Sequence, residues 1–195
     1  NNNLEIEFEN IMITNGAKQA IYNLFQVLLN DGDEVIIPSP YWLSYPAIVR
    51  LAGGKPVILK TSAENGFQID KQNLISKITS RTKFIIINSP NNPTGKVLKE
   101  KELNIIASVL REHQGINLIS DEIYELILKK GLKHISFAAF ANELKDRIYT
   151  VNGFAKGWAM TGWRLGYLVG KKEVIKASTT LQSQSTSNVC SFVQR

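Results

Sequence analysis

The sequence predicts an α/β fold built on a mostly parallel sheet. Two observations lead to this prediction: short runs of apolar and β-branched residues recur along the chain, and segments with helical periodicity separate them. Strands that alternate with helices favour a parallel sheet, because each crossover returns the chain to the same edge. The chain has 195 residues, of which 44% are hydrophobic and 21% charged. This length and composition are sufficient for one domain with a substantial core.

The predicted strands are short and rich in Val, Ile and Leu. Residues of this kind fit a pleated, largely buried surface. The strands are expected over residues 34–38, 56–60, 83–88, 117–120, 147–151 and 164–169.

Three helices are predicted between these strands. Residues 17–29 repeat apolar side chains every three or four positions and end at an Asn-Asp-Gly stop signal. Asp70 is expected to cap a second helix that runs to Ile78. Residues 99–113 carry apolar side chains on one face and form the third. We find no internal repeat and no low-complexity linker in the sequence.

Charge and composition argue against several classes of protein. The net charge is +6, but the 23 Lys and Arg residues are scattered, so we expect a small anionic ligand and no nucleic-acid partner. No apolar run approaches a membrane span of ~20 residues, so no membrane partner is expected. Cys190 is the only cysteine, and His113 and His134 lack ligand spacing and are expected at the surface. We therefore predict no metal site. No signal peptide is visible, so a cytoplasmic location is expected, and organellar targeting stays open as an alternative.

Chemically distinctive residues follow the predicted strands. Tyr41 and Trp42 come after the strand at 34–38, and Asn92 lies in the Pro-Asn-Asn-Pro-Thr-Gly segment after the strand at 83–88. The strand at 117–120 runs into Asp121 and Tyr124, and the strand at 147–151 runs towards Lys156. Ligands of open α/β sheets bind at the carboxyl ends of the strands. We therefore expect these side chains at one edge of the sheet.

Together these groups meet the requirements of pyridoxal phosphate. The Lys156 amine can form a Schiff base with an aldehyde, and an Asp121 carboxylate can keep a pyridine nitrogen protonated. Gly16, Ala17 and Lys18 open the helix at 17–29, whose N-terminus favours a phosphate.

Four further side chains complete this expected cofactor site. Arg164 can add a charge-assisted contact to the phosphate. Trp42 can stack on the ring, and Tyr124 and Asn92 can hydrogen-bond its phenolic oxygen. Each feature also has an ordinary structural explanation, for example Asp121 as a helix cap or Trp42 as a core residue. The functional interpretation depends on their occurring together.

The motifs in this order resemble those of the class I and II aminotransferases of pyridoxal-phosphate fold type I, in their bacterial aspartate aminotransferase branch. The resemblance covers nearly the whole chain, through the segments TNGAKQA, DGDEVIIPSPYWLSYP, NSPNNPTG, SDEIY and AKGWAMTGWRLGY. It implies a three-layer αβα fold, a homodimer, and transfer of an amino group from an amino acid to a 2-oxo acid. The chain is expected to be the cofactor-binding large domain over residues 1–195, a fragment that lacks the N-terminal arm and the C-terminal small domain and is inactive alone.

The resemblance also assigns roles to individual residues. It implies that Lys156 bonds covalently to the cofactor and shuttles a proton, and that Asp121 pairs with the ring nitrogen. Tyr124 and Asn92 contact the phenolic oxygen, and Asn92 also lies near the substrate carboxylate. Trp42 stacks on the ring. The phosphate is bound by Gly16, Ala17, Lys18 and Arg164.

Two departures from the family pattern bear on these roles. Gly153 stands where many members have a phosphate-binding serine three residues before the lysine. Ser183 stands where some aspartate aminotransferases have an arginine that reads the substrate side chain. Some bacterial members use a lysine at the position of Lys18 for this purpose. We therefore expect Lys18 to favour aspartate or glutamate, and prephenate-type substrates stay open.

Two other functions remain as alternatives. A lyase of the same fold, such as a C–S β-lyase, would use the same cofactor for elimination. The cofactor-sensing domain of a transcription regulator would keep Lys156 and Asp121 and would belong to a longer chain with a DNA-binding region.

Overall fold

The computed structural model describes residues 4–194, so residues 1–3 and 195 of the predicted domain lie outside the described residues. The described chain contains a seven-stranded sheet with the order β1-β7-β6-β5-β4-β2-β3. The pairings β2–β3, β2–β4, β4–β5 and β5–β6 are parallel, whereas β7 runs antiparallel to β1 and β6. The strands are β1 (Ile11–Thr14), β2 (Glu34–Ser39), β3 (Lys55–Lys60), β4 (Thr82–Asn88), β5 (Asn117–Asp121), β6 (Ile148–Gly153) and β7 (Gly166–Val169).

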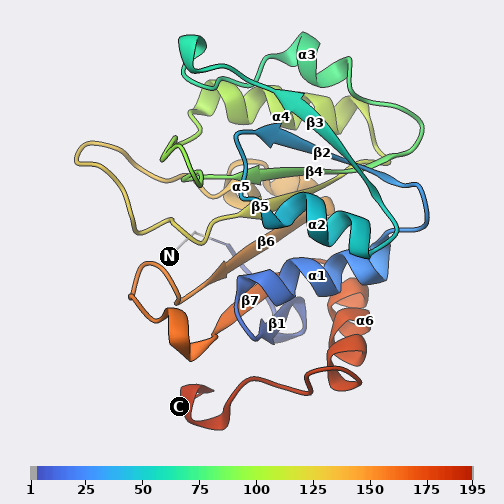
Figure 1. Cartoon of the computed structure of the whole chain (residues 1–195), viewed down its shortest axis with the longest axis vertical. Helices are drawn as coiled ribbons and strands as arrows, with labels where there is room; N and C mark the ends of the chain where they lie inside the picture. Colours follow the sequence, from blue (N-terminus) through green and yellow to red (C-terminus); the bar gives the residue numbers. More distant parts are fainter. Residues whose placement is uncertain (1–3, 195) are drawn as a thin grey trace.

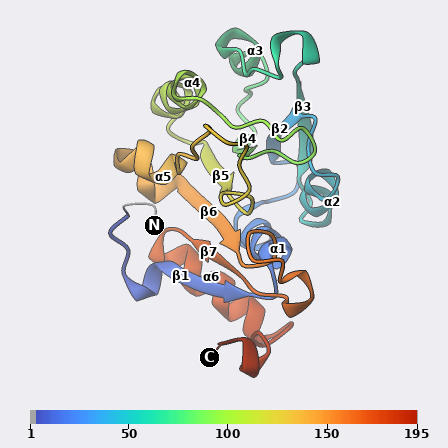
Figure 2. The same ribbon diagram turned by 90° about the vertical axis from the view of Figure 1, so that its left-hand side faces the viewer.

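Helices cover both faces of the sheet, which gives three layers (Figures 1 and 2). The helices α1, α2 and α6 lie on one face, and α4 and α5 lie on the other, with α3 packed on α4. The helices are α1 (Ala17–Leu28), α2 (Ser44–Leu51), α3 (Lys71–Ile75), α4 (Glu100–Glu112), α5 (Phe137–Phe140) and α6 (Lys172–Ser183). The predicted fold class is therefore confirmed.

Alternating residues of each central strand supply two separate cores. In β4, Phe84 and Ile86 pack with α1 and α2, whereas Ile85 and Ile87 pack with α4. Successive side chains of a strand point to opposite faces, and both faces of this sheet are covered. The strands therefore read as continuous apolar runs and show no alternation with polar residues.

The observed elements differ from the predicted ones in three ways. The strand predicted from Arg164 begins at Gly166, because Arg164 has a left-handed backbone (φ 55°) after the short 3-10 helix Thr161–Trp163. The helix capped by Asp70 ends at Ile75 instead of Ile78; the Asp70 carboxylate accepts a hydrogen bond from the Asn73 N–H, as predicted for the cap. The elements β1, α2, α5 and α6 were not predicted.

The direction of β7 brings an additional segment to the functional edge of the sheet. Strands β4, β5 and β6 all end at this edge, and because β7 is antiparallel to β6, it begins there. Gly153 at the end of β6 pairs with Gly166 at the start of β7. The residues just before β7, including Arg164, therefore join those that follow the parallel strands.

Candidate active site

All nine residues predicted for the cofactor and substrate line one cavity at this edge of the sheet. The cavity has a volume of about 420 Å³. Five further lining residues were missed in the sequence. The predicted residues are Gly16, Ala17, Lys18, Trp42, Asn92, Asp121, Tyr124, Lys156 and Arg164, and the missed residues are Tyr45, Asn88, Ile123, Ala155 and Thr161.

The N-terminus of α1 forms one wall of the cavity. Gly16 is its N-cap, with φ 80° and ψ 160°, and no side chain caps the helix. The first backbone N–H groups of a helix have no partner within it, so this end of α1 is suited to an anion. Gly16 cannot be replaced by a larger residue without a shift, because a Cβ atom there would lie 2.5 Å from Arg164 Nη2.

Arg164 links the turn before α1 to the segment before β7. Its Nη1 donates to the Thr161 carbonyl at 3.0 Å, and its Nη2 donates to the Asn15 carbonyl at 3.3 Å. The close approach of the two segments also needs Gly166, because a Cβ atom there would lie 2.5 Å from the Ala17 nitrogen. The guanidinium is therefore held beside the uncapped end of α1.

The backbone around Gly153 leaves no room for the serine that many members of the family resembled by this sequence carry at this position. A Cβ atom at this position would lie 2.7 Å from the Leu165 carbonyl oxygen and 2.8 Å from Gly166 Cα. Backbone atoms cannot yield as a flexible side chain can. The close contact of β6 with the start of β7 therefore accounts for glycine at this position.

Asp121, the last residue of β5, is the acidic group of the cavity. Its side chain accepts a hydrogen bond of 2.6 Å from the Tyr45 hydroxyl and one of 3.3 Å from the Ile123 N–H. Burial raises the pKa of Asp121 from 3.8 to about 6; these two hydrogen bonds lower it, and the charge of Glu122 raises it. Among residues 4–194, no ion pair joins Asp121 to a cation.

Asn92 and Tyr124 are joined by a hydrogen bond. The Asn92 Nδ2 donates to the Tyr124 hydroxyl at 3.3 Å. Asn88, at the end of β4, orients this pair, because its Oδ1 accepts from the Asn92 N–H at 2.7 Å and its Nδ2 donates to the Asp121 carbonyl at 2.9 Å. Burial raises the pKa of Tyr124, the charge of Asp121 raises it further, and the Asn92 bond lowers it.

Lys156 is exposed at the rim of the cavity in the described chain. One sequence expectation about a side chain is wrong. His134, expected at the surface, has a side chain only 8% exposed, and its Nε2 lies 3.1 Å from Glu122 Oε2. The loop after β5 folds His134 back onto Glu122, a long-range contact that residue spacing does not reveal.

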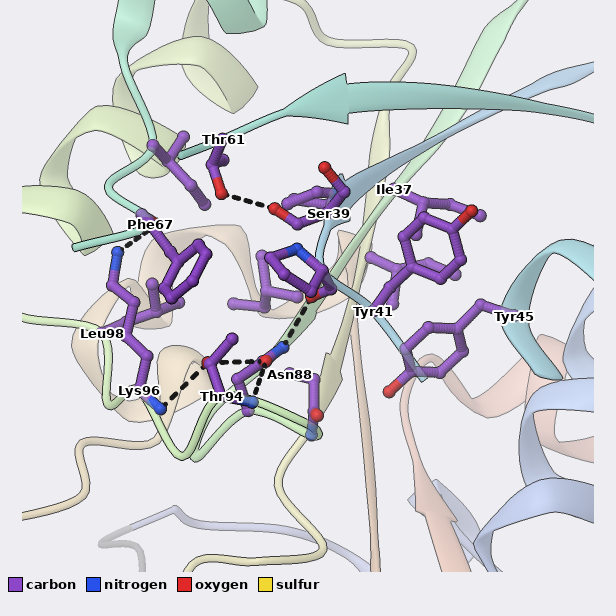
Figure 3. A pocket seen from close by; sticks show the side chains of 16 residues that line it. Ile37, Ser39, Tyr41, Tyr45, Thr61, Phe67, Asn88, Thr94, Lys96 and Leu98 are labelled. Carbon is purple, nitrogen blue, oxygen red and sulfur yellow. Dashed lines mark hydrogen bonds between the residues drawn. The ribbon is translucent and has the colours of Figure 1, made fainter. Parts of the chain in front are cut away.

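A smaller cavity of about 40 Å³ adjoins the candidate active site and shares Tyr45 and Asn88 with it. Figure 3 shows Lys96 at its far side, where Nζ donates to the Phe67 carbonyl. Lys96 also pairs with Glu102, and both side chains are largely buried. This cation is therefore already neutralised and is not available to the larger cavity.

Comparisons with known proteins agree with the geometry. The family profile described as "Aminotransferase class I and II" matches residues 1–195. A protein of Rickettsia bellii named "Probable aspartate/prephenate aminotransferase" is 52% identical over 193 residues, which cover 99% of this chain and 48% of that protein. "Aspartate aminotransferase" of Bacillus subtilis is 49% identical over 192 residues, with 98% and 49% coverage.

A solved structure gives the same result. The aspartate aminotransferase of Thermus thermophilus with maleate superposes with a TM-score of 0.91 at 48% identity, over 96% of this chain and 48% of that one. The chain thus spans about half the length of the relatives it matches. Within residues 4–194, no helix has the length and apolar character needed to cross a membrane.

Proposed function

Since the chain belongs to the class I and II aminotransferase family, we propose that the full-length protein is an amino-acid aminotransferase that uses pyridoxal phosphate. It would move an amino group from an amino acid to a 2-oxo acid through two half-reactions. Residues 1–195 would form its cofactor-binding large domain.

The distribution of charge in the cavity is the observation that carries the proposal. Lys18, Lys156 and Arg164 line the rim, and Asp121 is buried beneath with no cationic partner among the described residues. A buried carboxylate is costly unless it meets a cation or strong donors. The site therefore fits a ligand that carries an anion at one end and a protonated nitrogen at the other.

Pyridoxal phosphate meets both requirements. Its phosphate would be held by the uncapped N-terminus of α1 and by Arg164, and its ring nitrogen by Asp121. Asn92 and Tyr124, already joined by a hydrogen bond, would hold its phenolic oxygen. Trp42, half-buried at the cavity wall, would cover the ring.

The bound cofactor would supply a conjugated ring that accepts negative charge from the substrate α-carbon. The Lys156 amine would hold and return the proton at that carbon, as a general acid and base. Asp121 would keep its negative charge beside the ring nitrogen. Asn92 would orient the substrate carboxylate by hydrogen bonding.

An acidic substrate side chain is the best-supported class. Lys18 is exposed at the start of α1 and lines the same cavity, so its ammonium can reach a second carboxylate. The relatives' names, which include aspartate and prephenate, and the Thermus structure with maleate agree with a dicarboxylic substrate. We propose aspartate or glutamate as amino donor, with oxaloacetate or 2-oxoglutarate as partner.

We further propose a homodimer and a cytoplasmic location for the full-length protein. Large apolar side chains are exposed near the site, among them Trp158, Trp163 and Phe192, and exposed apolar groups of this kind favour burial against another surface. The exposed thiol of Cys190 fits a reducing compartment.

The test is to replace Lys156 with alanine in the full-length protein. Transfer from aspartate to 2-oxoglutarate should fall by at least about 10²- to 10⁴-fold, the contribution of a general acid and base, while cofactor still binds non-covalently. The matched control is Lys176→Ala, at an exposed position of α6, which should retain activity. Full activity of Lys156→Ala would contradict the proposal, and release of ammonia by the wild type without amino transfer would indicate a lyase.

A further inference from the structure

Tyr45 contacts the acidic group of the site from a helix that the sequence analysis did not predict. It is the second residue of α2 and is only 1% exposed. Its ring projects away from α2, with the hydroxyl at the far end of the ring (Figure 3). The hydroxyl donates to Asp121 Oδ2 at 2.6 Å, a short and strong hydrogen bond.

This contact fixes how the Asp121 carboxylate is presented. Oδ2 is held by Tyr45, and Oδ1 accepts the longer bond, of 3.3 Å, from the Ile123 N–H. The backbone is fixed as well, because the Asp121 carbonyl accepts from Asn88 Nδ2. Of the two donors to the carboxylate, the Tyr45 hydroxyl makes the shorter and stronger hydrogen bond, and the other donor is the Ile123 backbone N–H.

The ionisable groups around Asp121 show why a donor is needed here. Glu122 is adjacent in sequence, Tyr124 follows in the same loop, and Lys156 lines the cavity from the turn after β6. Burial, together with the nearby Asp121 charge, raises the pKa of Tyr45 well above its usual range. Tyr45 therefore stays protonated and acts only as a donor, which favours the charged carboxylate.

We propose that Tyr45 is a positioning residue that keeps the Asp121 carboxylate ionised and correctly oriented for the protonated ring nitrogen of the cofactor. This inference rests on the proposed function. It assigns to Tyr45 a role that the sequence motifs did not indicate, and it concerns cofactor binding before any chemistry.

The experiment uses the full-length protein without cofactor and titrates it with 4′-deoxypyridoxine phosphate. This analogue has the ring nitrogen and the phosphate but no aldehyde, so its affinity does not depend on a covalent bond to Lys156. Affinity is measured from pH 5.5 to pH 8.5 for the wild type and for Tyr45→Phe. The matched control is Tyr149→Phe, which removes the hydroxyl of another buried tyrosine that makes no hydrogen bond to Asp121 within residues 4–194.

Tyr45→Phe should lose about tenfold to hundredfold in affinity at pH 6, the effect of one hydrogen bond to a charged group. The loss should shrink towards pH 8.5, where Asp121 is ionised without help. Tyr149→Phe should follow the wild-type profile. An unchanged pH profile in Tyr45→Phe, or the same shift in Tyr149→Phe, would overturn the inference.

A double variant separates positioning from a general loss of structure. In an Asp121→Asn background the carboxylate is gone, so adding Tyr45→Phe should leave the pH profile of binding unchanged. A further pH-dependent loss in the double variant would show that Tyr45 acts elsewhere. If the wild type fails to bind the analogue at all, the proposed function fails with the inference; if it binds but the Tyr45 predictions fail, only the inference falls.

Discussion

The Lys18 ammonium lies 5.1 Å from the centroid of the Trp42 ring, in the arrangement of a cation–π contact. Such a contact at an exposed position is worth only ~0.5–1 kcal/mol, so a substrate carboxylate can compete for the lysine. Trp42 and Lys18 line the same cavity. The ring therefore holds the cation close to the site without neutralising its charge.

Lys18→Ala should change the substrate preference of the full-length enzyme. Loss of a charge-assisted hydrogen bond, worth ~1.5–3 kcal/mol, should lower kcat/KM for aspartate about tenfold to hundredfold. For alanine or an aromatic amino acid, kcat/KM should change much less, and Lys18→Arg should retain part of the preference. Equal losses for acidic and neutral substrates would show that Lys18 serves only the cofactor.

Arg164→Ala should weaken binding of pyridoxal phosphate. The variant loses the proposed phosphate contact and also the two hydrogen bonds from Arg164 to Thr161 and Asn15, so the cofactor affinity should fall about tenfold to hundredfold. Arg164→Lys should rescue only part of the loss, because an ammonium cannot present a planar fork. Fluorescence titration measures the affinity, and a wild-type dissociation constant in the alanine variant would contradict the role.

The central strands were predictable because both faces of the sheet are covered. Each therefore appears as an apolar run, and β2 to β6 were found within two residues of their observed ends. Helix α6 was missed because Ser178 and Gln182, both polar, face the interior and interrupt the apolar stripe. Strand β1 was missed because four residues are too short for a clear pattern.

The candidate site was predictable where side chains follow strands, and not where helices contribute. Asp121 and Tyr124 follow β5 directly, so the rule for strand ends places them. Tyr45 was missed because it reaches the site from α2, which begins at Ser44, and the rule for strand ends does not extend to a helix. The exposure of Lys156 and the burial of His134 depend on loop paths, which no local pattern specifies.

Asp121 should destabilise the cofactor-free protein near neutral pH. Burial raises the pKa of this carboxyl from 3.8 to about 6, so the folded state binds a proton more tightly than the unfolded state. The stabilisation of the folded state by the protonated Asp121 carboxyl is fully present below about pH 4 and is lost as the pH rises through about 6. A pKa shift of this size lowers the free energy of unfolding by about 3 kcal/mol once the carboxyl is fully ionised.

Asp121→Asn should therefore stabilise the cofactor-free protein while it weakens cofactor binding. The amide oxygen can still accept the shorter of the two native hydrogen bonds, the one from the Tyr45 hydroxyl, so the stronger contact of the carboxylate is kept. We expect urea unfolding to show that the free energy of unfolding of the variant, relative to the wild type, is about 1 to 2 kcal/mol larger at pH 8 than at pH 5. Asp31→Asn, at an exposed turn, is the control and should show no such growth. If Asp121→Asn stabilised the protein equally at both pH values, Asp121 would not be the group whose charge opposes folding. The argument that this carboxylate needs a cationic ligand would then lose its physical basis.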